Sequence, residues 1–135
     1  MFCFTYGDGL SDININKLIN FHKKSDKLCT LTAIQPVQRF GILKLTKKGT
    51  VKNFSEKPKI SEWINGGFFV ASPKVVNFVT SFNDPWEGKP IDNIVKNKQL
   101  IAYKHRGFWH CLDTLRDQKM LNKLWTSKKA PWKIW

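Results

Sequence analysis

FCFTYGDGLSDIN, residues 2–14, combines a short apolar run, a glycine-flanked carboxylate and the start of a helix. Aromatic and β-branched residues at 2–5 favour a buried strand, and the glycines at 7 and 9 free the backbone around Asp8. Asp12 can cap the helix that follows. Asp8 then stands at the carboxyl end of a strand, where open α/β sheets bind ligands, and a carboxylate there suits Mg²⁺ when the ligand carries phosphates. A simple Asp-Gly turn is the alternative.

Hydrophobic periodicity predicts alternating strands and helices after this stretch. A helix is expected over 13–24 and a strand parallel to the first over 28–35, so that the three elements form a βαβ unit. Further strands are predicted at 41–45, 51–55, 63–71, 100–104 and 107–111, with the first two as a hairpin, and helices after Ser72, at 90–96 and at 114–125. These elements indicate an α/β fold, a mixed sheet with flanking helices, in a single domain over residues 1–135.

Composition narrows the class of protein. The chain has 135 residues, of which 41% are hydrophobic, and this fits a globular domain with a core of its own. No run of about 18 apolar residues predicts a membrane span. Three widely spaced cysteines, Cys3, Cys29 and Cys111, indicate neither a disulfide framework nor a zinc site, so a reducing cytoplasm is expected.

The formal net charge of +13 would attract phosphates, nucleic acids or anionic lipid. Of the 23 basic residues, only Arg39, Arg106 and Arg116 are arginine, and the lysines are scattered along the chain. Sequence-specific DNA readers rely on the planar fork of arginine, and no basic helix is evident. We therefore expect no specific nucleic-acid partner, and keep a basic nucleic-acid-binding domain as an alternative.

Two carboxylates, Asp8 and Asp113, each follow a predicted strand and precede a helix start. Two such groups can converge on one edge of a sheet. Metal-assisted phosphoryl or nucleotidyl transfer needs this arrangement, because Mg²⁺ prefers one or two carboxylates together with phosphate oxygens. For Asp113, a helix N-cap is the alternative explanation.

Two further groups of residues could bind a sugar phosphate. Glu56 and Lys57 offer a carboxylate for hydroxyls and an ammonium for a phosphate, on opposite sides of a strand's end; a surface ion pair is the alternative. Asn65, Gly66 and Gly67 offer an amide and free backbone N–H groups, but paired glycines in a strand also indicate a β-bulge.

The chain holds six tryptophans, a high number for its length. Trp109 and Trp125 fall in core-like patterns. Trp132 and Trp135 belong to a basic, aromatic C-terminal stretch and are the expected interface residues.

Taken in order, these motifs resemble the sugar-phosphate nucleotidyltransferases, at the subfamily level the glucose-1-phosphate cytidylyltransferases. The resemblance runs the full length of the chain. It is carried by YGDG (6–9), RFG (39–41), EKP (56–58), WINGGFF (63–69), GFW (107–109), DTLRD (113–117) and APWKIW (130–135).

The resemblance implies a Rossmann-like, GT-A-like fold and transfer of the cytidylyl group of CTP to glucose 1-phosphate, giving CDP-glucose and pyrophosphate for deoxysugar and O-antigen synthesis. It implies that Mg²⁺ is the cofactor. Carried over by position, the implied metal ligands are Asp8 and Asp113, and the substrate-binding residues are Glu56, Lys57, Asn65 and Gly66, with Trp109 and Arg116 at the pocket edge.

One departure from the family pattern concerns the nucleotide. The Gly-rich loop that cradles the triphosphate in the family has no counterpart here and would lie upstream of Met1. We therefore expect the C-terminal part of a nucleotidyltransferase domain, acting as a homo-oligomer or with a separate N-terminal half. The strand at 2–5 would expose an apolar edge, which predicts instability or self-association. A catalytically silent sugar-phosphate-binding or complementing module is the second alternative.

Overall fold

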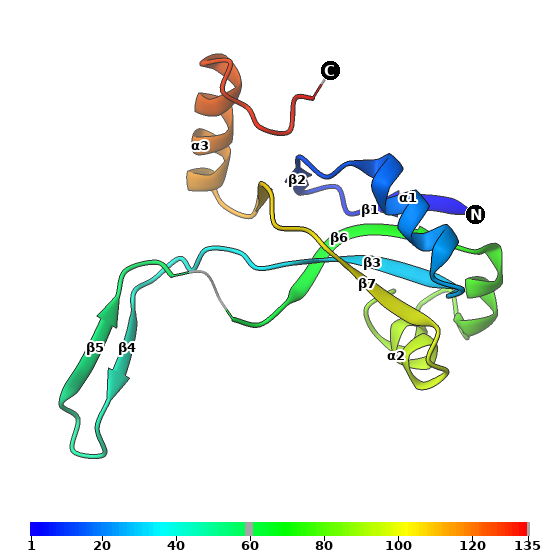
Figure 1. The fold of residues 1–135 in the computed structure, drawn as a ribbon, viewed down its shortest axis with the longest axis horizontal. Helices are drawn as coiled ribbons and strands as arrows, with labels where there is room; N and C mark the ends of the chain where they lie inside the picture. The colour runs from blue at the N-terminus through cyan, green and yellow to red at the C-terminus, as the bar shows by residue number, and fades with distance from the viewer. Residues whose placement is uncertain (59–60, 135) are drawn as a thin grey trace.

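The computed structural model describes residues 1–58 and 61–134 and builds them around a four-stranded mixed sheet (Figure 1). The strand order is β1 (Phe2–Thr5), β6 (Ile64–Ala71), β3 (Cys29–Ile34) and β7 (Leu100–Lys104). β6 runs antiparallel to both of its neighbours, whereas β3 and β7 are parallel. Two smaller ladders pair β2 (Gly9–Ser11) with β8 (Trp109–Cys111), and β4 (Ile42–Leu45) with β5 (Val51–Ser55).

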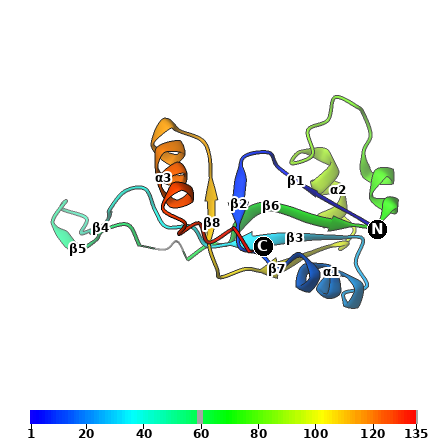
Figure 2. The same cartoon turned by 90° about the horizontal axis from the view of Figure 1, so that it is seen from above.

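Helices cover both faces of the main sheet (Figure 2). α1 (Ile15–Lys24) lies on one face, and η1 (Pro73–Phe78), a 3₁₀ helix, lies on the other with α2 (Lys89–Lys96). α3 (Leu115–Thr126) follows β8 and stands beside the small β2–β8 ladder. In the part of the chain that the structure describes, no helix is long and apolar enough to cross a lipid bilayer.

The core follows from the alternation of side chains along β6. Phe69 points to one face and packs in a cluster with Val75 of η1 and Ile94 of α2. Val70, the next residue, points to the opposite face and packs with Leu18 of α1. Because successive residues of a strand face opposite sides, one strand supports a separate apolar cluster under each helical layer.

The first strand, β1, is more exposed than its sequence predicted. β1 has the same direction as β3, because both pair antiparallel with β6, so the predicted parallel orientation is confirmed. β6 lies between them, however, and leaves β1 at the edge of the sheet with Phe2 41% exposed. The prediction of a buried strand is therefore wrong for β1, and the prediction of an exposed apolar edge is confirmed.

Several local predictions need correction. β2 forms where a loop was expected. The helix predicted after Ser72 is confirmed, and it is a 3₁₀ helix capped by Ser72. The N-cap of α1 is Asn14, whose side chain accepts a hydrogen bond from the Lys17 N–H, while Asp12 instead pairs with His105 at 2.8 Å. The predicted bulge at the paired glycines of β6 is confirmed, because the β3–β6 register shifts there.

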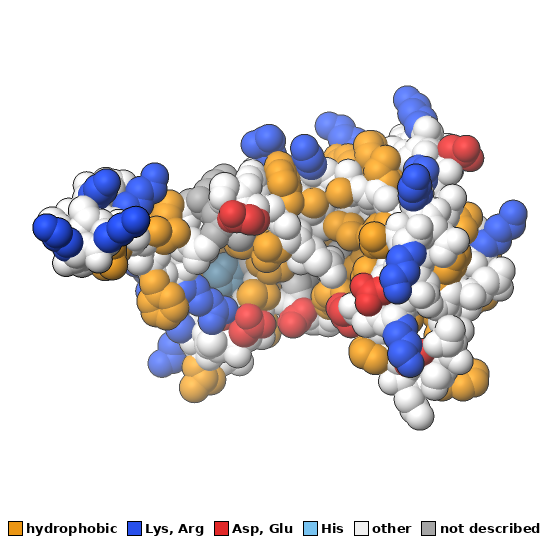
Figure 3. Space-filling model, turned by 90° about the horizontal axis from the view of Figure 1, so that it is seen from below, with side chains coloured by type: hydrophobic (Ala, Val, Ile, Leu, Met, Phe, Trp, Pro, Cys, Tyr) orange, Lys and Arg blue, Asp and Glu red, His pale blue; other side chains and the backbone are white. Residues whose placement is uncertain are grey.

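The β4–β5 hairpin extends away from the sheet (Figure 1), and every residue of its two strands except Ser55 is exposed. Leu43 pairs with Phe54 and both side chains are more than half exposed. Lysines and apolar side chains lie next to each other on this arm (Figure 3). The hairpin confirms the predicted turn at 46–49 and carries apolar surface that the rest of the chain does not bury.

The tryptophan predictions are largely reversed. Trp125, expected in the core, is 48% exposed. Trp132, expected at an interface, is buried with its ring 5.4 Å from the ring of Phe108. Trp135 lies outside the described residues.

Candidate active site

The two predicted metal carboxylates come from neighbouring positions of the β2–β8 ladder. Asp8 directly precedes β2 and is exposed; its carbonyl oxygen accepts a hydrogen bond of 2.8 Å from the N–H of Leu112. Asp113 is the residue after Leu112 and its side chain is 49% exposed. The antiparallel pairing of Gly9 with Cys111 thus brings positions 8 and 113 to the same end of the ladder.

Asp113 does not cap α3. The N-cap is Thr114, whose hydroxyl accepts a hydrogen bond of 3.2 Å from the N–H of Asp117, and the carboxylate of Asp117 accepts one of 2.9 Å from the N–H of Thr114. This reciprocal capping box satisfies the helix start. The alternative explanation for Asp113, that it is the N-cap of this helix, is therefore wrong.

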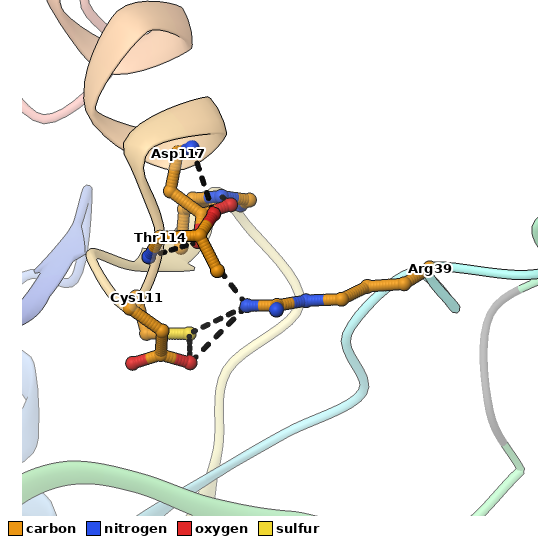
Figure 4. A network of polar contacts seen from close by, with 6 residues as sticks. Arg39, Cys111, Thr114 and Asp117 are labelled. Carbon is orange, nitrogen blue, oxygen red and sulfur yellow. Dashed lines mark hydrogen bonds and ion pairs between the residues drawn. The ribbon is translucent and has the colours of Figure 1, made fainter.

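Sequence reasoning missed a polar network that includes Arg39, Cys111, Thr114 and Asp117 (Figure 4) and that also involves Asp113. Arg39, from the loop between β3 and β4, places Nη2 at 3.1 Å from Oδ2 of Asp113 and at 3.2 Å from Oδ2 of Asp117. Cys111 donates from Sγ to Oδ2 of Asp113 at 3.0 Å, and His110 Nε2 lies 3.0 Å from Oδ1 of Asp117. The network joins three segments: the β3–β4 loop at 35–41, β8 and the start of α3.

Two pKa values reflect this network. Hydrogen bonds from Thr114 and His110, followed by the nearby charge of Arg39, hold the pKa of Asp117 well below its usual range. Burial and the neighbouring carboxylate of Asp113 raise the pKa of the Cys111 thiol to about 11. Asp117 is thus an anion and Cys111 a neutral thiol at neutral pH.

The capping box had a sequence signal. Thr114-x-x-Asp117 before an apolar run resembles the Ser/Thr-x-x-Glu pattern, with Asp replacing Glu. Arg39 belongs to the RFG motif, but its pairing had no sequence signal, because its partners lie more than 70 residues away in the chain and only the folded topology brings them together.

Asn65 and Gly66 are tied into the fold by their own hydrogen bonds. The Asn65 amide donates to the Tyr6 hydroxyl at 2.8 Å and accepts from the N–H of Gly67 at 2.9 Å. The carbonyl of Gly66 accepts from the indole N–H of Trp109 at 2.8 Å. These bonds fasten β6 to the segment after β1 and to β8, and they place Trp109 next to the predicted sugar-binding glycine.

Tyr6 is a further residue that sequence reasoning missed. Its pKa is raised to about 12, chiefly by burial and then by the carboxylate of Glu87. The hydroxyl is therefore protonated and fixed in the Asn65 contact. A Cβ at Gly67, whose φ is +77°, would lie 2.7 Å from the Tyr6 ring, so glycine is required at that position.

Glu56 and Lys57 form an ion pair with one another at 3.4 Å, and both side chains are substantially exposed. The two side chains do not lie on opposite sides of the strand's end, as was predicted. They form the surface ion pair that was the alternative. Lys57 adopts a left-handed backbone conformation, with φ of 44°. Its side chain borders the cleft described next.

A cleft of about 850 Å³ runs between the 34–40 loop, the β7–β8 connection and the first turns of α3. Of the predicted site residues, Lys57, Trp109 and Arg116 line it, together with the newly found Arg39 and Asp117. The other predicted residues, among those the structure describes, lie outside its lining: Asp8, Asp113, Glu56, Asn65 and Gly66.

Comparisons with known proteins place the chain in a family. Residues 1–116 match the family model described as nucleotidyl transferase. Glucose-1-phosphate cytidylyltransferase from Salmonella typhimurium is 46% identical over 99% of this chain and 52% of its own length. The probable glucose-1-phosphate cytidylyltransferase from Bacillus subtilis is 41% identical over 99% of the chain and 53% of its own length.

Solved structures support the fold. A putative glucose-1-phosphate thymidylyltransferase from Bacillus anthracis superposes with a TM-score of 0.61 at 16% identity, over 90% of this chain and 53% of that one. HddC from Yersinia pseudotuberculosis gives the same TM-score over 92% and 55%. The chain spans about half the length of the relatives and structures it matches. With 116 of its residues matching the family model, the chain belongs to the nucleotidyl transferase family.

Proposed function

We propose that this chain carries the sugar-phosphate and cation side of a glucose-1-phosphate cytidylyltransferase. The reaction is CTP with glucose 1-phosphate to CDP-glucose and pyrophosphate. The observation that carries the proposal is the 46% and 41% identity to relatives of that name over nearly the whole chain. The pairing that brings Asp8 and Asp113 to one end of the β2–β8 ladder supports it.

Asp8 and Asp113 would hold Mg²⁺. Their oxygen donors suit this cation, and the described residues contain no group of three or more His, Cys, Asp and Glu side chains able to hold a metal. The remaining ligands would therefore be phosphate oxygens and water, as is usual for Mg²⁺. When bound, the cation offsets the negative charge that develops on the leaving pyrophosphate.

The sugar phosphate is assigned to Glu56 and Lys57. The Lys57 ammonium borders the cleft and would contact the phosphate, while the Glu56 carboxylate would accept hydrogen bonds from sugar hydroxyls. Binding requires the exposed ion pair between the two side chains to open. Such a pair costs little to break, because exposed ion pairs contribute about 0–1 kcal/mol.

Asn65 and Gly66 would shape the wall of the sugar pocket, and Trp109 and Arg116 its edge. Because the Asn65 amide is engaged with Tyr6 and Gly67, it would act by fixing the wall as well as by touching the sugar. An oxygen of the sugar phosphate attacks the α-phosphorus of CTP, and the bond from that phosphorus to pyrophosphate breaks. No covalent enzyme intermediate is needed, so positioning and charge neutralisation supply the catalysis.

The partner is proposed from the sheet edge. β1 has one paired side, to β6, and its apolar side chains border a small apolar groove of about 240 Å³ lined by Phe4, Leu18 and Phe68, among others. An unpaired apolar edge favours strand addition. We propose that this edge pairs with a second copy or with a separate N-terminal half. Residues 1–135 would then be the C-terminal portion of the complete domain. We also propose that the protein acts in the cytoplasm, in O-antigen or deoxysugar synthesis.

A calorimetric titration of the purified chain with glucose 1-phosphate, with and without Mg²⁺, tests the proposal. We expect saturable binding in the millimolar range or tighter, weakened in Lys57→Met and unchanged in Lys96→Met, which removes the same charge on α2. If no binding is seen at a glucose 1-phosphate concentration of about 10 mM, the result would count against this function and against a catalytically silent sugar-phosphate-binding module. Saturable binding of RNA or DNA in its place would favour the nucleic-acid alternative.

A further inference from the structure

The guanidinium of Arg39 uses one of its three nitrogen atoms for the contacts that the structure describes. The contacts that the structure describes for its guanidinium, to Asp113, Asp117 and more distantly to Cys111, all involve Nη2. The side chain is 51% exposed and lines the cleft. Its Nη1 and Nε groups therefore keep their N–H donors for an acceptor that enters the cleft.

Asp117 provides Arg39 with an anchor that does not depend on Asp113. The Asp117 carboxylate is buried and also accepts from the N–H and hydroxyl of Thr114, at 2.9 and 2.8 Å. Its other oxygen lies 3.0 Å from His110 Nε2. Four contacts from three segments fix this carboxylate, so Arg39 keeps one partner in place when Asp113 takes up a cation.

The surroundings of Arg39 select for anions. Lys57, Arg106 and Arg116 line the same cleft, and the carboxylate among its lining residues is Asp117, whose charge is already shared. Basic side chains outnumber carboxylates in this lining, and such an excess of positive charge raises the local concentration of anions. The planar fork of arginine matches the oxygens of a phosphate, which a lysine meets only as a point charge.

We propose that Arg39, anchored on Asp117, is a phosphoryl-binding residue of this cleft. Its ligand class is a phosphate monoester or a pyrophosphate group, bound through the guanidinium N–H groups that the carboxylates leave free. The inference rests on the proposed function in that it adds a residue to the phosphate side of the same site. Asp117 is a positioning residue, since it acts on the ligand through Arg39.

The test uses inorganic pyrophosphate as the probe and the full 135-residue chain, titrated by calorimetry at fixed ionic strength. Arg39→Met is expected to weaken binding about tenfold, and Arg39→Lys less, because lysine keeps the charge and loses the fork. Arg106→Met is the matched control. It removes the same charge from the same cleft, but its guanidinium already stacks over the Trp63 ring at 5.2 Å, so we expect a change of less than about threefold.

Asp117→Asn separates anchoring from bulk charge. The substitution makes the chain more positive, so charge alone predicts tighter pyrophosphate binding, whereas loss of the anchor predicts weaker binding by about threefold or more. Circular dichroism at the titration temperature confirms that each variant is folded. If Asp117→Asn fails to fold, the comparison of Arg39→Met with Arg106→Met and Arg39→Lys decides the question alone.

Three outcomes would overturn the inference: equal losses in Arg39→Met and Arg106→Met, tighter binding in Asp117→Asn, or no saturable pyrophosphate binding by the unsubstituted chain up to about 10 mM. The experiment involves neither CTP nor turnover. Arg39-dependent pyrophosphate binding, with no cytidylyl transfer by the chain mixed with the remaining half of the relative, would therefore reject the proposed reaction and keep this inference. Transfer by that mixture that is unaffected by Arg39 would do the reverse.

Discussion

The N–H of Leu112 donates a 2.8 Å hydrogen bond to the carbonyl of Asp8, and this contact brings the backbone at positions 8 and 113, more than 100 residues apart in the chain, to the same end of the β2–β8 ladder. The bond closes the β2–β8 ladder at its carboxylate end. A cation held between Asp8 and Asp113 would link the segment after β1 to the start of α3.

The first prediction concerns this cation. Asp8→Asn and Asp113→Asn should each weaken Mn²⁺ binding at least about tenfold, because each removes one of two anionic ligands. Water-proton relaxation enhancement by Mn²⁺, used in place of Mg²⁺, measures the affinity. Asp26→Asn is the matched control: Asp26 is exposed in the α1–β3 turn at φ 50°, a conformation that asparagine tolerates. Equal Mn²⁺ affinity in all three variants would contradict the site.

The second prediction concerns the tie between β6 and β8. Trp109→Phe removes the indole donor and leaves the Gly66 carbonyl without its partner, so we expect a loss of about 1 kcal/mol in the free energy of unfolding. Urea unfolding followed by circular dichroism provides the measurement. Trp125→Phe is the control, because that ring is 48% exposed, and its loss should be smaller. A larger effect at Trp125 would argue against the Trp109–Gly66 contact.

The third prediction concerns pH. The pKa of Asp117 is lowered in the folded state by hydrogen bonds from Thr114 and His110 and by the charge of Arg39. A carboxyl with a lowered folded pKa contributes stability that is present above its ordinary pKa of 3.8 and is lost as the pH falls through the folded value. The unfolding temperature of the unsubstituted chain should therefore fall with acid below that point.

The matching variants separate this effect from general acid unfolding. Asp117→Asn should be less stable at neutral pH and should lose less of its unfolding temperature between pH 5 and pH 2 than the unsubstituted chain. Asp92→Asn, an exposed carboxyl on α2, should keep the original acid slope. Identical slopes in all three proteins would show that Asp117 is not linked to folding.

The fourth prediction concerns the edge of the sheet. β1 exposes Phe2 and Cys3 beside an unpaired strand edge, so the isolated chain should sediment faster than a monomer at micromolar concentration. Thr5→Lys should shift sedimentation toward the monomer, because an edge lysine opposes strand addition. Thr126→Lys, on exposed α3, is the control. A chain that is monomeric at all concentrations would contradict the self-association proposed for this edge.

Much of the fold was predictable from local patterns. Hydrophobic periodicity and turn residues predicted the bounds of most strands to within one or two residues. Apolar runs such as 29–34 and 64–71 end at turn residues or at a helix cap. β1 is the instructive error. Its apolar sequence predicts a buried strand, but burial requires a second neighbouring strand on the edge opposite β6. The described residues do not supply that strand.

The candidate site divides in the same way. The positions of Asp8 and Asp113 next to strands were predictable from local patterns, and the ladder brings their backbone positions to one end; their role as metal ligands stays a prediction. Arg39 was not, since nothing in the 39–41 motif indicates that its side chain reaches across to Asp117. Long-range pairing of charges is a property of topology, and the sequence pattern reports only what lies within a few residues.

Pyrophosphate release from CTP and glucose 1-phosphate, in Mg²⁺, tests the central claim most directly. The purified chain is assayed alone and after mixing with the remaining half of the Salmonella typhimurium relative, the part outside the matched 52%. We predict release in the mixture that requires glucose 1-phosphate and disappears in Asp8→Asn but not in Asp26→Asn. Release that persists in Asp8→Asn, or a mixture that stays silent although both parts bind one another, would contradict the assignment of this chain to cytidylyl transfer.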